Sequence, residues 1–324
     1  MINMIGKRNY FFILSGIIIL AGLVVFFING GIKGGFVLDI QFEGGTVIQI
    51  EMPDDNYDTA KAEKIVKDTI GKSAIVQKAS TFNAENSAAK LYLMNLKIGS
   101  KETLSQDDRS KVISALKSEF NLDENAETTV NSIEPFIGKE IMNKGLQAIF
   151  WSSFFIILYV WWRFKIMSGL SAGVMAVLAL LHDILIMCVV YIFFRIPLND
   201  SFIAAVLTVI GYSMNDTIII YDRIRENSNL LRKTPIAELV NRSVIQTLSR
   251  SINTSVVVLL CIITVFIFAS VNNIQSIREF TFPLIIGLAS GTYSSIFIAS
   301  SLYVVWKEHL LKKKVAAKAA KSRA

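Results

Sequence analysis

The sequence is poor in cysteine, histidine and proline: its 324 residues include two cysteines, two histidines and five prolines. Cys188 and Cys261 both fall inside apolar runs, so no disulfide can brace a domain outside a membrane. Residues 71–73 resemble the end of a phosphate-binding loop but lack the earlier glycine that such a loop needs. We therefore expect no nucleotide site, no metal site and no other cofactor.

Charged residues are sparse along much of the chain, which is 52% hydrophobic and 18% charged. Six apolar runs approach the roughly 20 residues that a membrane-spanning helix needs. The sequence therefore predicts a polytopic α-helical membrane protein with six transmembrane helices. The runs cover residues 10–28, 146–162, 170–194, 201–221, 252–271 and 282–305.

Lysine and arginine mark one side of the predicted membrane. They gather at alternate ends of the apolar runs, whereas the opposite short loops hold only Arg195 and Arg278. The positive-inside rule then places both termini in the cytoplasm and the region between the first two helices outside. We expect an N-terminus 1–8, a first helix 9–29, an external domain 30–143, a five-helix bundle 144–305 with a cytoplasmic loop 222–251, and a basic tail 306–324.

The net charge of +7 reflects this topology. The external domain is acidic, with 18 Asp and Glu against 13 Lys and Arg, so the positive charge lies at helix ends and in the tail. Basic residues are not clustered on a soluble face with aromatic side chains, so we expect no nucleic-acid partner. The lysines at 312–314 are expected to contact anionic lipid.

The external domain alternates extended and helical patterns. Strands are expected at residues 46–51, 74–81, 89–96 and 127–133, and helices at 57–70 and 104–120. This β-α-β-β-α-β order predicts a ferredoxin-like α+β domain. We expect it to move as a rigid body on its glycine-rich link to the first helix, residues 30–35.

Asp216 is the main candidate for chemistry in the membrane, because an ionisable residue in such a segment is expensive and usually functional. Tyr212 and Ser213 precede it by four and three residues, so their hydroxyls are expected on its face of the helix. Arg250, at the entrance of the next helix, is its expected counter-charge. A carboxylate that alternates between a desolvated setting and a nearby cation can take up and release a proton.

A second carboxylate, Asp183, lies midway along the third predicted helix, beside His182. We predict a proton-coupling role for Asp216, Arg250 and Asp183. Tyr212, Ser213, Asn215 and His182 are expected to support them, although His182 fits a structural donor equally well. Gly287 and Gly291 form a small-residue pattern that predicts close helix packing.

Two runs carry a specific resemblance: TVIGYSMNDTIIIYDRIREN at residues 208–227 and NRSVIQTLSRS at 241–251. With ALLHD at 179–183, they resemble the SecD/SecF family of protein-export membrane subunits, part of the resistance-nodulation-division superfamily. The pattern of one helix, a large external domain and five further helices also resembles half of a transporter of that superfamily. The chain has Asp39 and Gln41 where the family tends to have Gly and Asp, and Glu134 where Gly is usual.

The resemblance implies an accessory, non-enzymatic subunit in a bacterial plasma membrane. Such a subunit works with a SecD half and the SecYEG channel, and uses the proton gradient to promote late translocation and release of exported polypeptides. The family's proton-linked aspartate falls on Asp216 and its helix-five arginine on Arg250.

Two other functions fit parts of the pattern. A proton-driven exporter of lipid or small molecules would share the intramembrane carboxylates, but it should also have an apolar cleft in its external domain. An intramembrane protease would need a base beside Ser213, and His309 lies in the tail, which argues against it.

Overall fold

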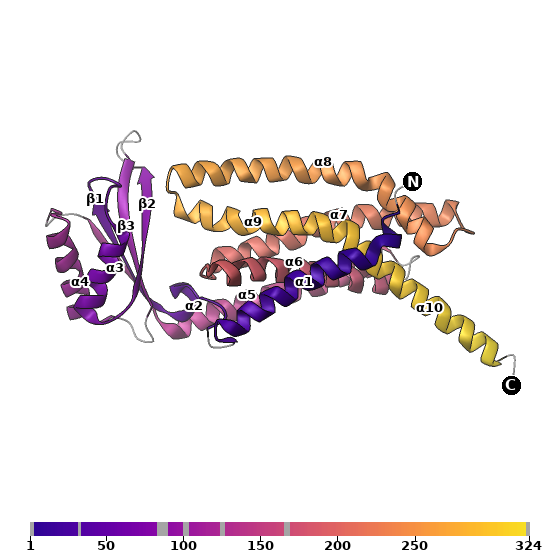
Figure 1. Ribbon diagram of the computed structural model, residues 1–324, viewed down its shortest axis with the longest axis horizontal. Coiled ribbons are helices and arrows are strands. Elements are labelled where there is room, and N and C mark those ends of the chain that lie inside the picture. Colours follow the sequence, from indigo (N-terminus) through magenta and orange to yellow (C-terminus); the bar gives the residue numbers. More distant parts are fainter. Residues whose placement is uncertain are drawn as a thin grey trace.

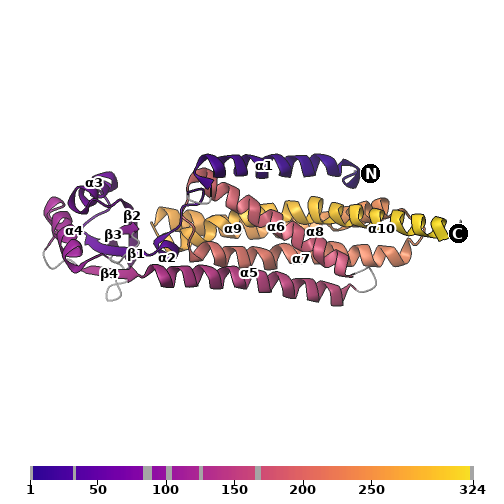
Figure 2. The ribbon, with the colours of Figure 1, turned by 90° about the horizontal axis from the view of Figure 1, so that it is seen from below.

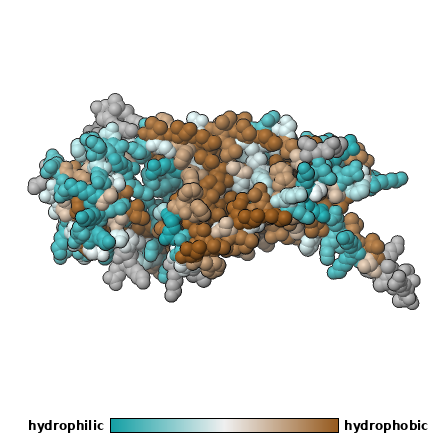
Figure 3. All heavy atoms as spheres, viewed as in Figure 1, coloured by the Kyte–Doolittle hydropathy of each residue, from teal (hydrophilic) through white to brown (hydrophobic). Residues whose placement is uncertain are grey.

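The structure is a computed structural model that describes residues 3–31, 34–82, 90–99, 104–123, 127–164 and 169–321. It has two parts, a bundle of long helices and a small sheet domain at one end of that bundle (Figures 1 and 2). Hydrophobic residues cover the middle of the bundle, whereas the sheet domain and the opposite helix ends are hydrophilic (Figure 3). This banding is what a protein that crosses a bilayer needs.

The six predicted membrane helices are confirmed among the described residues. The last span continues from α9 through a π-helical turn, η4 (Ser294–Ala299), into α10. The long helices of the bundle are α1 (Arg8–Ile28), α5 (Pro135–Arg163), α6 (Gly169–Phe194), α7 (Asp200–Leu230), α8 (Ile236–Val271), α9 (Gln275–Tyr293) and α10 (Ser300–Lys321).

The connection at residues 222–251 differs from the predicted loop. α7 continues to Leu230 and α8 already begins at Ile236, so only residues 231–235 are not helical. Asn227 lies inside this hairpin and donates from Nδ2 to Ser243 Oγ at 2.8 Å and to Gln246 Oε1 at 2.8 Å. Polar contacts between the two helices therefore extend the bundle beyond its apolar belt.

The sheet domain contains α2 (Ile40–Glu43), β1 (Gly45–Met52), α3 (Thr59–Ile70), β2 (Ala74–Phe82), β3 (Lys90–Gly99), α4 (Gln106–Glu119) and β4 (Thr128–Ile133). From β1 onward the element order agrees with the sequence prediction. The strands lie in the order β2-β3-β1-β4, and every neighbouring pair is antiparallel.

Local signals fix the ends of the two long helices of this domain. The Asp58 carboxylate accepts from the backbone N–H of Ala60 at the start of α3, and Ser105 caps α4 in the same way. Gly71, in the left-handed conformation at φ 68°, ends α3, so residues 71–73 form a helix end followed by a strand. Buried side chains such as Ile48, Leu96, Val66 and Leu116 then fill the space between sheet and helices.

Close packing in the membrane depends on the predicted glycine pair in α9. A Cβ on Gly287 would overlap Val209 Cγ2, and a Cβ on Gly291 would lie 2.9 Å from Ser213 Cβ. Without a hydrophobic driving force between helices in lipid, such close approach is a main source of stability. The glycines therefore bring α9 directly against α7.

We expect Gly287→Ala to lower the stability of the full chain by about 1–3 kcal/mol, because the added methyl overpacks the α7–α9 contact. Gly211→Ala is the matched control, since a Cβ there meets nothing within 4 Å. Thermal unfolding of both purified variants in the same detergent measures the difference. Equal midpoints for the two variants would contradict the packing role of Gly287.

Candidate functional site

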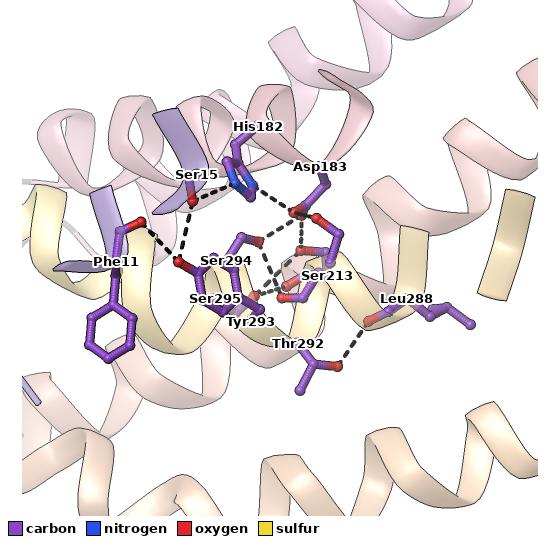
Figure 4. Close-up of polar contacts among 12 residues, drawn as sticks. Phe11, Ser15, His182, Asp183, Ser213, Leu288, Thr292, Tyr293, Ser294 and Ser295 are labelled. Carbon is purple, nitrogen blue, oxygen red and sulfur yellow. Dashed lines mark hydrogen bonds and ion pairs between the residues drawn. The ribbon is translucent and has the colours of Figure 1, made fainter. Parts of the chain in front are cut away.

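Asp183 is the most completely buried carboxylate of the bundle, with no exposed surface. Ser213 on α7 donates to its Oδ2 at 2.9 Å. Ser290 on α9 donates to Oδ1 at 2.8 Å, and Ser294 on η4 donates to Oδ2 at 2.8 Å. Three hydroxyl donors, one each from α7, α9 and η4, therefore surround one side chain of α6 (Figure 4).

Asp183 and its three serine donors, here called the Asp183 cluster, are connected through His182 to α1. His182 Nδ1 lies 3.2 Å from Asp183 Oδ1, and its Nε2 lies 3.0 Å from Ser15 Oγ. Ser15 Oγ is in turn 3.3 Å from the hydroxyl of Tyr293, which donates to the carbonyl oxygen of Phe11 at 2.9 Å. A continuous hydrogen-bond chain thus joins α1, α6, α9 and η4 (Figure 4).

Asp216 has a much poorer set of partners. Its side chain is 1% exposed, and the hydrogen bond described for it comes from Ser255 Oγ on α8, at 3.3 Å. Its other oxygen, Oδ1, is buried and has no partner among the described residues. An ionised carboxylate in this position is poorly compensated, since buried charges need several donors or a counter-charge.

The arrangement around Asp216 corrects two expectations. Ser213 points to Asp183 instead of Asp216, because the close approach of α9 at Gly291 places the α9 serines on that side of α7. Arg250 is exposed, and among the ion pairs of the described residues none joins it to Asp216. The hydrogen bond described for Asp216 comes instead from Ser255 of α8.

The remaining predicted residues of α7 differ in burial, and the hydroxyl of Tyr212 is buried. Tyr212 is partly buried and Asn215 is exposed. Asn215 belongs to an exposed series of small and polar residues at helical spacing with Ala204, Thr208 and Gly211. In lipid, a stripe of this kind is typical of a helix-packing surface. No group of three metal-ligating side chains occurs in the part of the chain that the structure describes.

A second polar cluster joins the sheet domain to the bundle. Lys97 of β3 lies 2.7 Å from Asp39 Oδ2 and 3.6 Å from Glu279 Oε1 on α9. Glu279 also accepts from Asn199 Nδ2 at 2.6 Å. Asp39 is buried, so this pairing with Lys97 compensates its charge. A cavity of about 270 Å³ opens beside these residues.

The α8–α9 turn makes a further junction with the sheet domain. Asn273 Nδ2 donates to Asp55 Oδ2 at 2.9 Å, and the Asn273 carbonyl accepts from the backbone N–H of Ser80 at 3.2 Å. Ser80 Oγ also donates to the carbonyl oxygen of Asn272. Burial is the main cause of a raised pKa at Tyr57, and the nearby Asp55 carboxylate raises it further. Tyr57 therefore stays neutral and donates a hydrogen bond to the Leu93 carbonyl. The sheet domain is therefore fastened to the bundle as well as tethered to it.

Comparisons with known proteins agree on one family. The family model for the C-terminal part of the protein export membrane proteins SecD/SecF matches residues 112–309. Protein translocase subunit SecF of Alicyclobacillus acidocaldarius is 33% identical over 96% of this chain and 94% of its own length. The chain belongs to the SecD/SecF family of protein export membrane proteins.

Longer relatives in this family are also similar. Protein translocase subunit SecDF of Thermus thermophilus is 35% identical over 94% of this chain, which matches 38% of the SecDF chain. A crystal structure of SecDF, described as a translocon-associated membrane protein, superposes with a TM-score of 0.76 at 30% identity. That match covers 95% of this chain and 39% of the SecDF chain. The SecD/SecF fold of this chain therefore corresponds to one part of SecDF.

Several contacts of these polar clusters were missed from the sequence. Ser290 and Ser294 look like ordinary small residues of a packed helix, and Ser15 lies in an otherwise apolar run. Asp39 and Gln41 stood out as departures from the family pattern. Both lie at the junction, since Gln41 Oε1 accepts from the Asp200 backbone N–H at 3.0 Å.

We expect Asp183→Ala to destabilise the full chain by about 3 kcal/mol, because three buried hydroxyls and His182 lose their acceptor. Asp216→Ala should cost about 1 kcal/mol, because only one long hydrogen bond is lost. Thermal unfolding of both variants in one detergent compares two equal truncations. A larger loss for Asp216→Ala would show that the hydrogen-bond networks do not set the stability of the bundle.

Proposed function

We propose that this chain is an accessory subunit of Sec protein export that couples the proton gradient to late translocation and release of polypeptides. The sheet domain lies on the extracytoplasmic side, and both termini lie in the cytoplasm of a bacterial cell. The chain acts together with a SecD half and beside the SecYEG channel. In this proposal the chain is not an enzyme and acts through a change of conformation.

The contrast between the two buried carboxylates carries the proposal. Asp183 has donors on both oxygens, so it is suited to a fixed structural role, and His182 extends its hydrogen-bond network toward α1. Asp216 has one long hydrogen bond and an unpartnered oxygen. This arrangement suits a protonated Asp216, and release of the proton would require new partners. Asp216 is therefore the proposed proton carrier.

Arg250 is the proposed partner of the ionised state. It lies on α8, five residues before Ser255, so about 7.5 Å separates the two along the helix axis. A shift of α8 against α7 would exchange the Ser255 contact for the Arg250 guanidinium. One proton that crosses the membrane supplies about 2.3 kcal/mol per 100 mV, enough to bias such a two-state equilibrium.

The SecD half is proposed to cover the exposed stripe of α7 formed by Ala204, Thr208, Gly211 and Asn215. Known relatives that join SecD and SecF in one chain support this partner. In this assembly the chain is half of a resistance-nodulation-division bundle, and its sheet domain is of the ferredoxin-like type. The basic tail contacts anionic lipid. The exporter alternative gains no support, because the curated relatives described above are translocase subunits.

We expect Asp216→Asn to fold and to assemble with the SecD half but to lose gradient-stimulated export, because the amide cannot release a proton. Asp222→Asn is the matched control on the same helix, since Asp222 pairs with Arg163 and Arg225 in the C-terminal part of α7. Export into inverted vesicles, with and without a proton gradient, gives the readout. Full stimulation in Asp216→Asn would transfer the carrier role to Asp183.

Arg250→Met should reduce gradient stimulation about tenfold or more, because the ionised state of Asp216 loses its proposed counter-charge. Arg242→Met, another exposed arginine of α8, should leave stimulation unchanged. The same vesicle assay at matched protein levels compares the two. An equal effect of both substitutions would reduce Arg250 to a general positive charge at the membrane surface.

A disulfide between Ser80→Cys and Asn273→Cys should hold the sheet domain on the bundle and stop export while assembly stays intact. The two positions adjoin in the structure through their backbone hydrogen bond. Reduction should restore export, and each single cysteine variant serves as the control. Undiminished export with complete cross-linking would show that the sheet domain does not need to leave this position.

A further inference from the structure

The cavity of about 270 Å³ at the junction of sheet domain and bundle has a lining that the proposed export function does not use. Asp39, Gln77 of β2 and Glu279 of α9 line its polar side. Tyr191 of α6 and Phe282 of α9 line its aromatic side. Small-molecule sites begin at roughly 300 Å³, so the cavity has the size and the mixed lining of a site for a small ligand group.

Hydrogen-bond acceptors on the sheet side of the cavity are poorly satisfied. Gln77 Oε1 is buried and has no partner among the described residues. The same holds for Asn95 Oδ1, directly across the ladder on β3. Asp39 Oδ1 accepts from the Gln41 N–H at 3.4 Å, which is a weak contact. This side of the cavity therefore offers oxygen atoms that need a donor.

Donors on the bundle side of the cavity are already engaged. Asn199 Nδ2 and Gln275 Nε2 both donate to the Glu279 carboxylate, and Arg278 Nη2 donates to Gln275 Oε1. Since a buried acceptor without a donor is costly, the cavity favours a ligand rich in N–H groups. A primary ammonium has three donors and no acceptor, so it matches this lining.

The charges at the cavity indicate that the ligand also carries a negative group. Asp39 pairs with Lys97 at 2.7 Å, and Arg278 directly precedes Glu279 on α9. These two negative and two positive side chains leave no net charge. A lone cation would add an uncompensated charge to a half-buried site, whereas a zwitterion would not.

The position of the cavity indicates which zwitterion reaches it. Tyr191 lies near the end of the apolar run 170–194, and Phe282 begins the run 282–305, whereas Arg278 lies just before that run. The cavity therefore lies where the hydrocarbon region gives way to phospholipid headgroups. Figure 3 shows the same boundary as the change from brown to teal between the bundle and the sheet domain.

We propose that this cavity binds the headgroup of an aminophospholipid of the phosphatidylethanolamine class, in the leaflet next to the sheet domain. The ammonium lies between Asp39, Gln77 and Glu279, and the phosphate contacts the Arg278 guanidinium, which suits phosphate geometry. Aromatic walls attract any ammonium, so the acceptors are what distinguish ethanolamine from choline. The bound lipid contacts both β2 and α9 and strengthens their junction. This site goes beyond the export function and does not depend on it.

Native mass spectrometry of the full chain in one detergent tests the proposal with a series of lipids. The series is phosphatidylethanolamine, its N-monomethyl and N,N-dimethyl derivatives, and phosphatidylcholine. Each methyl group removes one N–H donor, so affinity should fall at every step. Phosphatidylcholine should bind at least about tenfold more weakly than phosphatidylethanolamine, because hydrogen bonds from a charged donor are strong. Phosphatidylglycerol measures the contribution of the phosphate alone.

Gln77→Leu should weaken phosphatidylethanolamine binding about tenfold and leave phosphatidylcholine binding unchanged. Its lipid-free thermal midpoint should not fall, because an apolar side chain replaces an unpartnered buried acceptor. Gln49→Leu is the matched control. Gln49 lies opposite Asn95 on the same face of the sheet, is partly buried and does not line the cavity. Arg278→Met should weaken phosphatidylethanolamine and phosphatidylglycerol alike.

Four outcomes would overturn the proposal. Equal affinity across the methylated series would remove the role of the N–H donors. Unchanged binding in Gln77→Leu and Arg278→Met would place the lipid elsewhere on the chain. A lower lipid-free midpoint for Gln77→Leu than for Gln49→Leu would show that Gln77 has a partner within the chain. Displacement of the lipid by a lysine-containing exported peptide would make the client the occupant. The export proposal would stand in each case, since Asp216→Asn tests it in a separate assay.

Discussion

The bundle depends on the need to satisfy a carboxylate that has no access to water. Asp183 meets this need with hydroxyls from α7, α9 and η4 and with His182 from its own helix. An unsatisfied polar group in the hydrocarbon region costs several kcal/mol, so these donors cannot be displaced one at a time without loss. Asp183 thereby sets how α6, α7 and α9 cross. The glycines of α9 allow the approach, and the Asp183 cluster selects one register for it.

Asp216 belongs to the same helix as Ser213, three residues further on, yet it faces α8 instead of α9. α7 is therefore held firmly on one side and weakly on the other. The proposed function requires a bundle that changes shape without coming apart, and this difference between the two sides of α7 is consistent with it. The side with a complete network keeps the fold, and the side with an unpartnered oxygen is free to exchange partners at low cost.

Hydropathy and periodicity predicted the six helices and the order of strands and helices along the sheet domain, because each of those signals is local. The partners of Ser213 could not be read from its spacing to Asp216, since spacing gives the face of a helix but not the neighbour that packs on it. The helical hairpin at 222–251 was missed because its polar residues bond to one another across two helices, as Asn227 does with Ser243. Lys97 and Glu279 are far apart in sequence and ordinary in type, so their pairing with Asp39 depends on the tertiary fold.

α9 connects the two polar clusters. Glu279 near its start binds the sheet-domain lysine, and Ser290 near its end binds Asp183, about 16 Å further along the axis. Pro283 lies between them and η4 follows Tyr293, so regular helical hydrogen bonding is interrupted near both contacts. A rearrangement in the membrane that moves α9 must therefore also strain or release the Lys97 contact. This shared helix gives the bundle a direct mechanical route to the sheet domain, separate from the connection through α1.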